Sequence, residues 1–328
     1  MITFENVGKI YPNGFKAVKN LNLVIQRGEL IALIGPSGCG KTTIMRMINR
    51  LSPHTEGTLL INNEDILKKD PVELRRMIGY VIQQAGLFPH YTIEENIALV
   101  PGLKGWDRNR IRDRVRDMLD LVGLEPSQFT TRRPRELSGG QQARIGFARA
   151  LAADPDIVLM DEPFAPLDPI TRQQLQDELK NLQVSMKKTI VLVTHDMEEA
   201  IKLGDRIAII MDGSLVQVDT PDKVLKEPAN DFVETFIGKN RIYKNPALIS
   251  IKEVMIENPA TGLPTFRPTE AFSAMRRRRA DTLILCDTKG RLTGVISAYD
   301  LQMCMNSIKT IQEISEENYP YLNSTATA

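Results

Sequence analysis

Residues 35–42 read Gly-Pro-Ser-Gly-Cys-Gly-Lys-Thr and fit the pattern G-x-x-x-x-G-K-[ST]. They follow an apolar run at Leu30–Ile34 and precede a helical stretch at Thr43–Asn49, the strand–loop–helix context that the pattern requires. Glycines let backbone N–H groups converge on a phosphate, and the N-terminus of the next helix adds partial positive charge. Lys41 is expected to reach the β- and γ-phosphates, and the Thr42 hydroxyl to bind Mg²⁺. The stretch therefore predicts a loop that binds the phosphates of a nucleotide.

Short apolar runs stand on both sides of this loop in the sequence. Each has four or five residues, is rich in β-branched types and lacks polar alternation, as strands buried on both faces do. Helical stretches at Arg108–Val122 and Thr171–Lys187 lie between them. Strands that alternate with helices predict an α/β fold with a parallel sheet covered by helices. The runs are Leu30–Ile34, Ile157–Met160, Ile190–Val193 and Ile207–Met211.

Composition is that of an ordinary globular protein. The 328 residues include 42 Lys and Arg against 41 Asp and Glu, so the net charge is +1, which argues against a general nucleic-acid binder. The cysteines, Cys39, Cys286 and Cys304, are odd in number and far apart, which predicts a reducing, cytosolic compartment. No stretch approaches the roughly 20 apolar residues that span a bilayer. At about 100–200 residues per domain, the length predicts two domains.

Two carboxylates end one of the apolar runs. Asp161 and Glu162 directly follow Ile157–Met160, and ligands bind at the strand ends of open α/β sheets. Asp161 fits the position that holds Mg²⁺ together with the loop hydroxyl. Glu162 can face the γ-phosphate and accept a proton from the attacking water. The alternative, a solvated pair of carboxylates, is the weaker interpretation beside a phosphate-binding loop.

The sequence contains a second segment suited to an anion. Leu137-Ser138-Gly139-Gly140-Gln141 precedes the helical stretch Gln142–Ala152, and two glycines with a serine before a helix can bind a phosphate. Taken alone, the segment could also be a turn and a helix cap. Because one γ-phosphate needs only one loop, a second site predicts another nucleotide, and hence two chains that face each other.

With these residues in place, the chain resembles the ATPase subunits of ABC transporters. The resemblance covers about residues 1–238 and implies a P-loop NTPase core with a parallel-rich sheet and a helical subdomain at about 87–150. Five motifs stand in the family's order and spacing. They are the adenine-stacking Tyr11, Gln83 of the Q-loop, the LSGGQ signature at Leu137–Gln141, Asp168 of the D-loop and the switch histidine His195.

The resemblance also implies the cofactors ATP and Mg²⁺ and an ATPase coupled to transport. Two chains would form a head-to-tail homodimer, with each ATP between one chain's phosphate-binding loop and the other's signature. Pro166 departs from the small residue usual in the D-loop, and it removes an N–H that a contact could use. The implied catalytic residues are Glu162, His195, which would contact the γ-phosphate, and Gln83; the implied Mg²⁺ ligands are Thr42, Gln83 and Asp161. The implied nucleotide-binding residues are Tyr11, Val18, Gly35, Pro36, Ser37, Gly38, Cys39, Gly40, Lys41, Thr42, Thr43, Ser138, Gly139, Gly140, Gln141 and Asp168.

Three further segments resemble the ATPases of binding-protein-dependent importers of quaternary-amine osmolytes such as glycine betaine, carnitine and choline. They are Gly79–Gln84, Leu87–His90 and Asp168–Arg172. This resemblance implies two transmembrane permease subunits as partners, bound through the helical subdomain. It also implies an extracytoplasmic substrate-binding protein that acts indirectly, no nucleic acid, and a peripheral position at the cytoplasmic face of the cell membrane.

Other cargo and other uses of the same ATPase stay open. Transport of another amphiphile such as bile acids, export, and a soluble ABC ATPase outside transport are the alternatives. The DNA-repair type inserts a long coiled coil between the phosphate-binding loop and the signature. Only about a hundred residues separate Lys41 from Leu137, which disfavours that type.

The last part of the chain has a different pattern. A polar, basic linker is expected at residues 239–250, before a small α+β domain at residues 251–328. Thr282–Asp287 and Leu292–Ser297 predict a β-hairpin around the turn at 288–290.

This domain resembles a single or truncated CBS unit. Gly294–Asp300 is similar to the closing strand and Asp of a CBS motif, and Val254, Met255 and Pro259 are similar to its opening. After Asp300 only 28 residues remain, too few for a second motif. We therefore expect the unit to pair with its copy in a second subunit.

Arg276–Arg279 is the one strong run of charge. It ends a helical stretch, Thr269–Ala280, whose buried side we expect to carry Ala271, Phe272 and Met275. The run is then either a solvated face or a patch that responds to anions such as a nucleotide or anionic lipid headgroups. Screening by salt would make such a patch sensitive to ionic strength.

Overall fold

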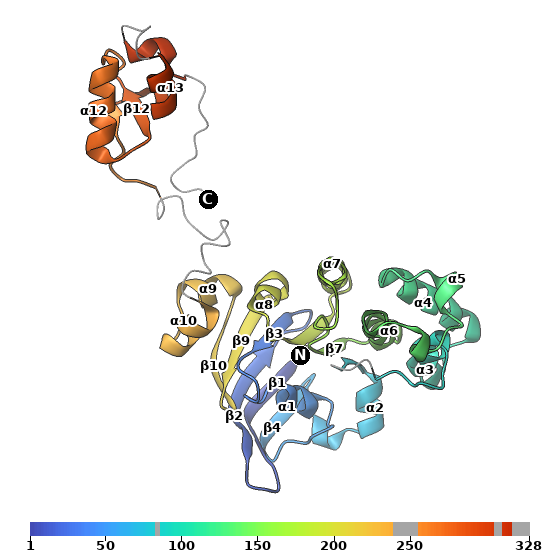
Figure 1. Cartoon of the computed structure of the whole chain (residues 1–328). Coiled ribbons are helices and arrows are strands. Elements are labelled where there is room, and N and C mark those ends of the chain that lie inside the picture. The colour runs from blue at the N-terminus through green and yellow to red at the C-terminus, as the bar shows by residue number, and fades with distance from the viewer. Residues whose placement is uncertain (83–85, 239–254, 305–309, 317–328) are drawn as a thin grey trace. The chain divides into compact units, whose positions relative to one another are not determined.

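The computed structural model describes residues 1–82, 86–238, 255–304 and 310–316. The chain divides into two compact units, Met1–Lys239 and Asn240–Ala328. In Figure 1 the first unit runs from blue to yellow, and the second is orange to red. Among the described residues, no helix has the length and apolar character needed to cross a bilayer.

A six-stranded sheet forms the centre of the first unit. Across it the order is β10 (Ser214–Asp219), β9 (Arg206–Met211), β3 (Leu30–Ile34), β8 (Thr189–Val193), β7 (Ile157–Asp161) and β6 (Ile78–Val81). All neighbours pair in parallel except β10, which is antiparallel to β9. Every residue of β3, β7 and β8 is buried. The parallel sheet predicted from the apolar runs is therefore confirmed.

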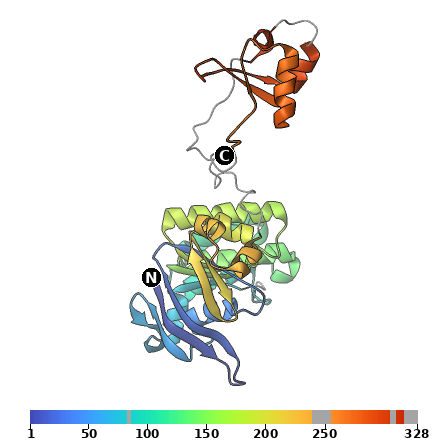
Figure 2. The same ribbon diagram turned by 90° about the vertical axis from the view of Figure 1, so that its left-hand side faces the viewer.

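Alternate residues of the central strands enter different cores, as the period of two in a strand requires. Leu159 of β7 packs toward a core shared with a second, antiparallel sheet, whereas Met160 packs toward the opposite face. The antiparallel sheet is drawn in blue in Figure 2. Its strands, in order, are β2 (Lys16–Ile25), β1 (Ile2–Ile10), β4 (Glu56–Ile61) and β5 (Glu64–Asp65).

Helix α1 (Lys41–Ile48) lies within that shared core. Its Ile44, Met45, Met47 and Ile48 are buried against residues of both sheets. The packing fixes the N-terminus of α1 directly after the loop at residues 35–40, at the carboxyl end of β3.

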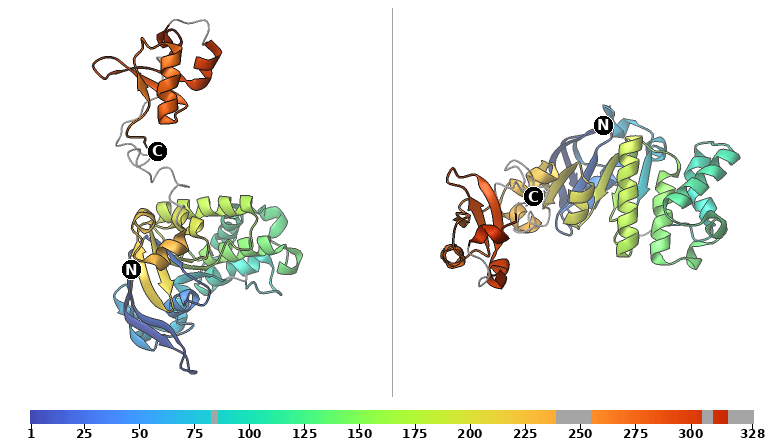
Figure 3. Two further views of the ribbon diagram at one scale, coloured as in Figure 1. Left: turned by 60° about the vertical axis from the view of Figure 1, so that its left-hand side comes forward. Right: turned by 90° about the horizontal axis from the view of Figure 1, so that it is seen from above.

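Helices cover the other face of the parallel sheet. α7 (Pro169–Met186) contributes Leu175 and Leu179 to one core, and α8 (Met197–Leu203) contributes Met197 and Ala200 to another. Figure 3 shows α7 as a long helix beside the sheet. The remaining helices of this side are α9 (Pro221–Lys226) and α10 (Asp231–Ile237).

In the described part of the chain between β6 and β7, four helices form a layer beside the sheet. They are α3 (Ile93–Leu103), α4 (Arg108–Leu121), α5 (Pro126–Phe129) and α6 (Gly139–Ala152), and the short α2 (Pro71–Arg76) precedes β6. α6 packs against α3 and α4 through a core that includes Ile97, Leu119 and Phe147. This layer, green in Figure 1, carries the segment at residues 137–141 at the start of α6.

The second unit is built on the hairpin of β12 (Thr282–Cys286) and β13 (Leu292–Ser297), which confirms the predicted hairpin. The short β11 (Thr261–Gly262) pairs in parallel with β12. α12 (Pro268–Arg278) and α13 (Ala298–Cys304) pack on this sheet.

The charge run of this unit lies on α12 as expected. The helix buries Ala271 and Met275, half-buries Phe272, and leaves Arg276–Arg279 exposed. The expected linker at 239–250, Val254 of the CBS resemblance and the chain's last residues lie outside the described residues.

Candidate functional site

The loop before α1 depends on glycine at two close approaches of the backbone. Gly35 has φ +151°, and a Cβ there would lie 2.1 Å from the carbonyl oxygen of Ile210. Gly40 has φ +109°, and its Cβ would lie 2.6 Å from the carbonyl oxygen of Ala17. Both conformations are ones that glycine adopts without penalty. The glycines of the sequence motif therefore let the loop fold tightly against β2 and β9.

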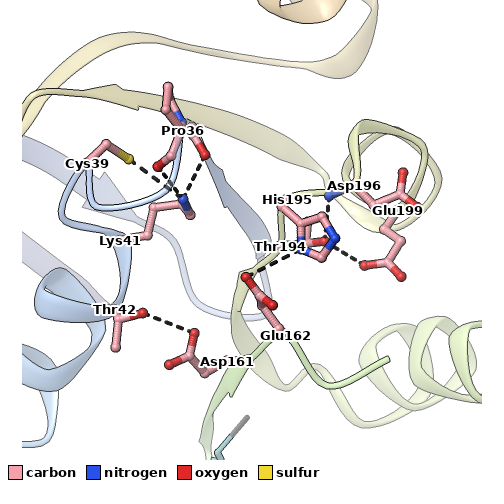
Figure 4. Close-up of polar contacts among 11 residues, drawn as sticks. Pro36, Cys39, Lys41, Thr42, Asp161, Glu162, Thr194, His195, Asp196 and Glu199 are labelled. Carbon is pink, nitrogen blue, oxygen red and sulfur yellow. Dashed lines mark hydrogen bonds and ion pairs between the residues drawn. The ribbon is translucent and has the colours of Figure 1, made fainter. Parts of the chain in front are cut away.

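Lys41 holds its ammonium group inside the curve of this loop. The residue is 8% exposed, and its Nζ donates to the carbonyl oxygens of Gly35 at 2.7 Å and Pro36 at 2.9 Å (Figure 4). The Sγ of the buried Cys39 lies 3.7 Å from the same nitrogen. The loop's own carbonyl groups therefore hold the ammonium group at the cavity that the loop lines.

A cavity of about 500 Å³ lies over the loop. It brings together nine residues that the sequence predicted and two, Phe15 and Ala17, that it did not. The lining residues are Tyr11, Phe15, Ala17, Ser37, Gly38, Gly40, Lys41, Thr42, Thr43, Glu162 and His195.

The turn between β1 and β2 forms one wall of the cavity. The N–H of Tyr11 donates to the carbonyl of Phe15 at 2.9 Å, so both aromatic rings belong to one tight turn. The Tyr11 hydroxyl lies 3.4 Å from Thr43 Oγ1, and this hydrogen bond lowers the pKa of Tyr11. Val18, an expected nucleotide contact, is 1% exposed and belongs to the core, and its neighbour Ala17 lines the cavity instead.

Thr42 and Asp161 join the loop to the end of β7. Thr42 Oγ1 donates to Asp161 Oδ1 at 3.2 Å, although the two residues are 119 positions apart. Asp161 is buried, which raises the pKa of its carboxyl, and the hydrogen bond from Thr42 acts in the opposite direction. The pair presents a hydroxyl and a carboxylate side by side at the start of α1 and the end of β7.

Glu162 and His195 face each other at the ends of neighbouring strands. Glu162 has φ +48°, and its N–H donates to the carbonyl of Val193 at 2.9 Å. This turn leads the side chain toward β8, where Glu162 Oε1 lies 3.3 Å from His195 Nδ1 (Figure 4). The His195 side chain is 66% exposed, so the ring can still reach a ligand in the cavity.

The other expected site residues lie at helix starts away from this cavity. Ser138 caps α6 in a capping box with Gln141, and Gly139 has open space around it. Asp168 caps α7 by accepting the N–H of Thr171 at 3.0 Å, which lowers the pKa of the carboxyl. Neither segment lines the cavity of its own chain. Gln83 lies outside the described residues.

The fold and this site are those of an ABC transporter ATPase. Residues 18–165 match the ABC transporter family, and the chain belongs to it as an ATP-binding subunit, an ATPase coupled to transport. The resemblance seen in the sequence is thereby confirmed.

Two curated relatives extend this match over both units. The chain is 50% identical over 323 residues to the carnitine transport ATP-binding protein OpuCA of Listeria monocytogenes, which covers 98% of this chain and 81% of that protein. It is 50% identical over 328 residues to the choline transport ATP-binding protein OpuBA of Bacillus subtilis, covering 99% of this chain and 86% of that protein.

A solved structure shows the same fold in a nucleotide-bound dimer. It is a post-hydrolysis state of the ATP-binding cassette MJ0796 bound to ADP and Pi, with 37% identity and a TM-score of 0.64. The match covers 67% of this chain and 99% of that one. The chain therefore binds ATP, and homologues of this class dimerise and act with membrane permease components.

Proposed function

We propose that this chain powers the import of quaternary-amine osmolytes, the class that includes glycine betaine, carnitine and choline. The observation that carries the proposal is the 50% identity to subunits named for carnitine and for choline transport. This identity extends over 98% of the chain in the first case, so it includes the C-terminal unit as well as the ATPase. An ATPase subunit does not itself hold the cargo, so the sequence similarity carries the assignment.

The residues at the cavity fit a complex of ATP with Mg²⁺. The Thr42 hydroxyl and the Asp161 carboxylate are hard oxygen donors, and Mg²⁺ typically takes one or two such protein ligands beside phosphate oxygens and water. Gln83, expected to be a further ligand, follows β6 in the chain. When bound, the ion would supply positive charge that offsets the negative charge of the ATP phosphates.

Glu162 and His195 have complementary roles in this proposal. Glu162 accepts the proton of the attacking water, and its carboxylate lies at the end of β7 beside the predicted metal ligand Asp161. His195 donates a hydrogen bond toward the γ-phosphate, while its Nδ1 side contacts Glu162 at 3.3 Å. Lys41 neutralises phosphate charge from inside the loop.

The signature and the D-loop serve the partner's ATP in this proposal. Ser138 caps α6, and Gly139, Gly140 and Gln141 form its first turn, where the partial positive charge of a helix start attracts phosphate. Because neither they nor Asp168 line the cavity of their own chain, they suit a head-to-tail homodimer with two shared sites. Pro166 has no N–H to give to such an interface.

Two permease subunits complete the transporter in this proposal, and the chain lies peripherally at the cytoplasmic face of the membrane. The contact is expected through the layer of α3–α6, as the resemblance to importer ATPases implies. An extracytoplasmic binding protein would deliver the osmolyte to the permeases and never touch this chain.

The C-terminal unit, residues 251–328, serves in this proposal as a CBS-like regulatory unit that pairs with its copy. Arg276–Arg279 are all exposed, and their shared ligand chemistry is phosphate, from a nucleotide or from lipid headgroups. Replacing Arg277 and Arg278 together by Ala should then abolish activation of transport by high osmolality and leave basal transport intact. Activation that persists in this variant would exclude the patch as a sensor.

Uptake of labelled glycine betaine, carnitine and choline tests the cargo directly. Cells would carry the native transporter with the wild-type subunit or with Lys41→Ala, at low and high osmolality. The exposed Lys68→Ala serves as the matched control for loss of a lysine. We expect uptake that requires Lys41, tolerates Lys68→Ala and rises with osmolality. Uptake of none of the three compounds, with ATPase activity intact in vitro, would contradict the osmolyte assignment and leave the ATPase standing.

A further inference from the structure

A second, smaller cavity of about 140 Å³ adjoins the nucleotide cavity. Glu162 and His195 line both cavities, so the smaller one lies directly behind the reacting groups. Of the other residues around it, Arg172 belongs to α7 and Glu199 to α8, and the rest lie in the loops that follow β7 and β8. The lining residues are Glu162, Ala165, Arg172, Thr194, His195, Asp196 and Glu199.

Glu199 is a buried carboxylate of this cavity that has no role in the proposed hydrolysis. It is 6% exposed, and its Oε2 accepts a hydrogen bond of 2.6 Å from Thr194 Oγ1 (Figure 4). Thr194 is 1% exposed, and its Oγ1 in turn accepts the N–H of Asp196 at 3.0 Å. Because a hydroxyl has one proton, the direction of both bonds is fixed: Thr194 gives its proton to Glu199 and receives one from Asp196.

Helix α7 anchors the other oxygen of Glu199. The Gln176 Nε2 lies 3.4 Å from Glu199 Oε1, and Gln176 Oε1 accepts from Lys202 Nζ at 3.3 Å. Lys202 also pairs with Asp177 at 2.7 Å. The amide of Gln176 is thus oriented with its oxygen to the lysine and its nitrogen to the carboxylate. Both oxygens of Glu199 therefore act as acceptors in a continuous network.

The network fixes the backbone on both sides of His195. The preceding residue, Thr194, donates its hydroxyl proton to Glu199, and the following residue, Asp196, donates its N–H to the same hydroxyl oxygen. The His195 ring itself takes no part in these bonds and points toward Glu162. The backbone beneath His195 is therefore fixed while its ring faces the nucleotide cavity.

We propose that Glu199 is a positioning residue for His195: by holding Thr194, and through it the N–H of Asp196, it sets where the imidazole meets the γ-phosphate. The inference rests on the role proposed above for His195. A misplacement of about 1 Å in a reacting group can cost on the order of 10²-fold in rate. A buried carboxylate that never touches substrate can thus control turnover.

Steady-state kinetics of the full chain give the first test. We expect Glu199→Ala and Thr194→Val each to lower kcat at least tenfold and to leave the KM for ATP within about twofold. Thr194→Ser keeps the hydroxyl and should restore kcat. The kcat of Glu199→Gln should lie between those of wild type and Glu199→Ala. The amide oxygen of the new side chain can still accept from Thr194, but its NH₂ group cannot accept the hydrogen bond from Gln176 Nε2. Glu29→Gln is the matched control, since Glu29 is equally buried at the opposite end of β3.

A double-mutant cycle separates positioning from general stability. If Glu199 acts through His195, adding Glu199→Ala to His195→Ala lowers the residual single-turnover rate no further. A further tenfold loss in the double variant, or a rise in KM equal to the fall in kcat, would overturn the proposal. If His195→Ala alone leaves kcat unchanged, the role of His195 fails instead, and the two failures are thereby distinguished.

NMR of the ring nitrogens supplies a readout that does not depend on turnover. The chain has three histidines, His54, His90 and His195, so each signal can be assigned by single substitution. Glu199→Gln should shift the His195 signals and leave those of His54 and His90 in place. Unchanged His195 signals would contradict the proposal even if the rate fell.

Discussion

His195 Nδ1 lies 3.3 Å from Glu162 Oε1, and the two residues lie just after β8 and β7, which are neighbours in the parallel sheet. The contact couples the proposed general base to the proposed γ-phosphate sensor. The unusual backbone of Glu162, with φ +48°, is what turns its side chain toward β8. The sheet register therefore decides the geometry of the reaction centre.

Removal of the base should separate ATP binding from hydrolysis. Glu162→Gln keeps the shape of the side chain but cannot accept a proton, so we expect kcat to fall by about 10²–10⁴-fold. The Kd for ATP should change little, because Lys41 and the loop still hold the phosphates. Phosphate release measures the first quantity, and equilibrium titration of a fluorescent ATP analogue measures the second.

The exposed Glu178 on α7 offers a matched control for this change. Glu178→Gln should hydrolyse ATP at the wild-type rate. If Glu162→Gln retained more than a tenth of wild-type kcat, another group would have to accept the proton.

Tyr11 is expected to bind the adenine by stacking. Base–aromatic stacking is worth about 1–3 kcal/mol, so Tyr11→Ala should raise the Kd for ATP at least about fivefold. Tyr11→Phe should stay near wild type, because the hydrogen bond to Thr43 is long at 3.4 Å. The affinity for inorganic tripolyphosphate, which lacks a base, should be the same in all three proteins.

Phe15 provides the competing explanation for base binding, since it lines the same cavity. A large loss in Phe15→Ala with none in Tyr11→Ala would assign the stacking to Phe15 instead.

The Thr42–Asp161 pair predicts how activity depends on Mg²⁺. Asp161→Asn replaces a charged oxygen by a neutral amide, so we expect half-maximal hydrolysis to need at least tenfold more Mg²⁺. Thr42→Ser keeps the hydroxyl and should leave the Mg²⁺ requirement unchanged, and excess EDTA should abolish turnover of wild type. An Asp161→Asn titration that coincides with wild type would remove Asp161 from the metal site.

Local patterns in the sequence predicted the parts of the site that follow strands. The apolar runs placed Lys41, Asp161 and His195 at the carboxyl ends of parallel strands, because such strands share one edge. Phe15 and Ala17 carry no such signal, since they lie around an irregular turn whose register depends on pairing of β1 with β2.

The contacts of Glu199 with Thr194 and Gln176 could not be predicted from the sequence either. Gln176 and Glu199 are 23 positions apart on two helices, and only the packing of α7 beside α8 brings them together. Periodicity shows which face of a helix is buried but not which polar groups meet there.

Burial of Glu199 predicts a pH dependence of stability with a definite sign. Burial raises the pKa of this carboxyl, and nearby Asp196 raises it further, whereas the hydrogen bond from Thr194 and the charges of Arg172 and His195 oppose the shift. Between the ordinary and the raised pKa, the native state binds more protons than the unfolded chain. The free energy of unfolding contributed by Glu199 therefore falls as pH rises through this interval.

Glu199→Gln removes this contribution, so the stability of wild type relative to the variant should decline from acid toward neutral pH. Urea unfolding followed by Trp106, the single tryptophan, measures this difference for the ATPase unit. Repeating the comparison of the two proteins on a His195→Ala background removes the imidazole as a neighbour of Glu199, and the remaining neighbours are the same in both proteins. A difference that stays constant with pH would mean that the pKa of Glu199 is the same in the folded and unfolded chain, and that its two hydrogen bonds fully offset its burial.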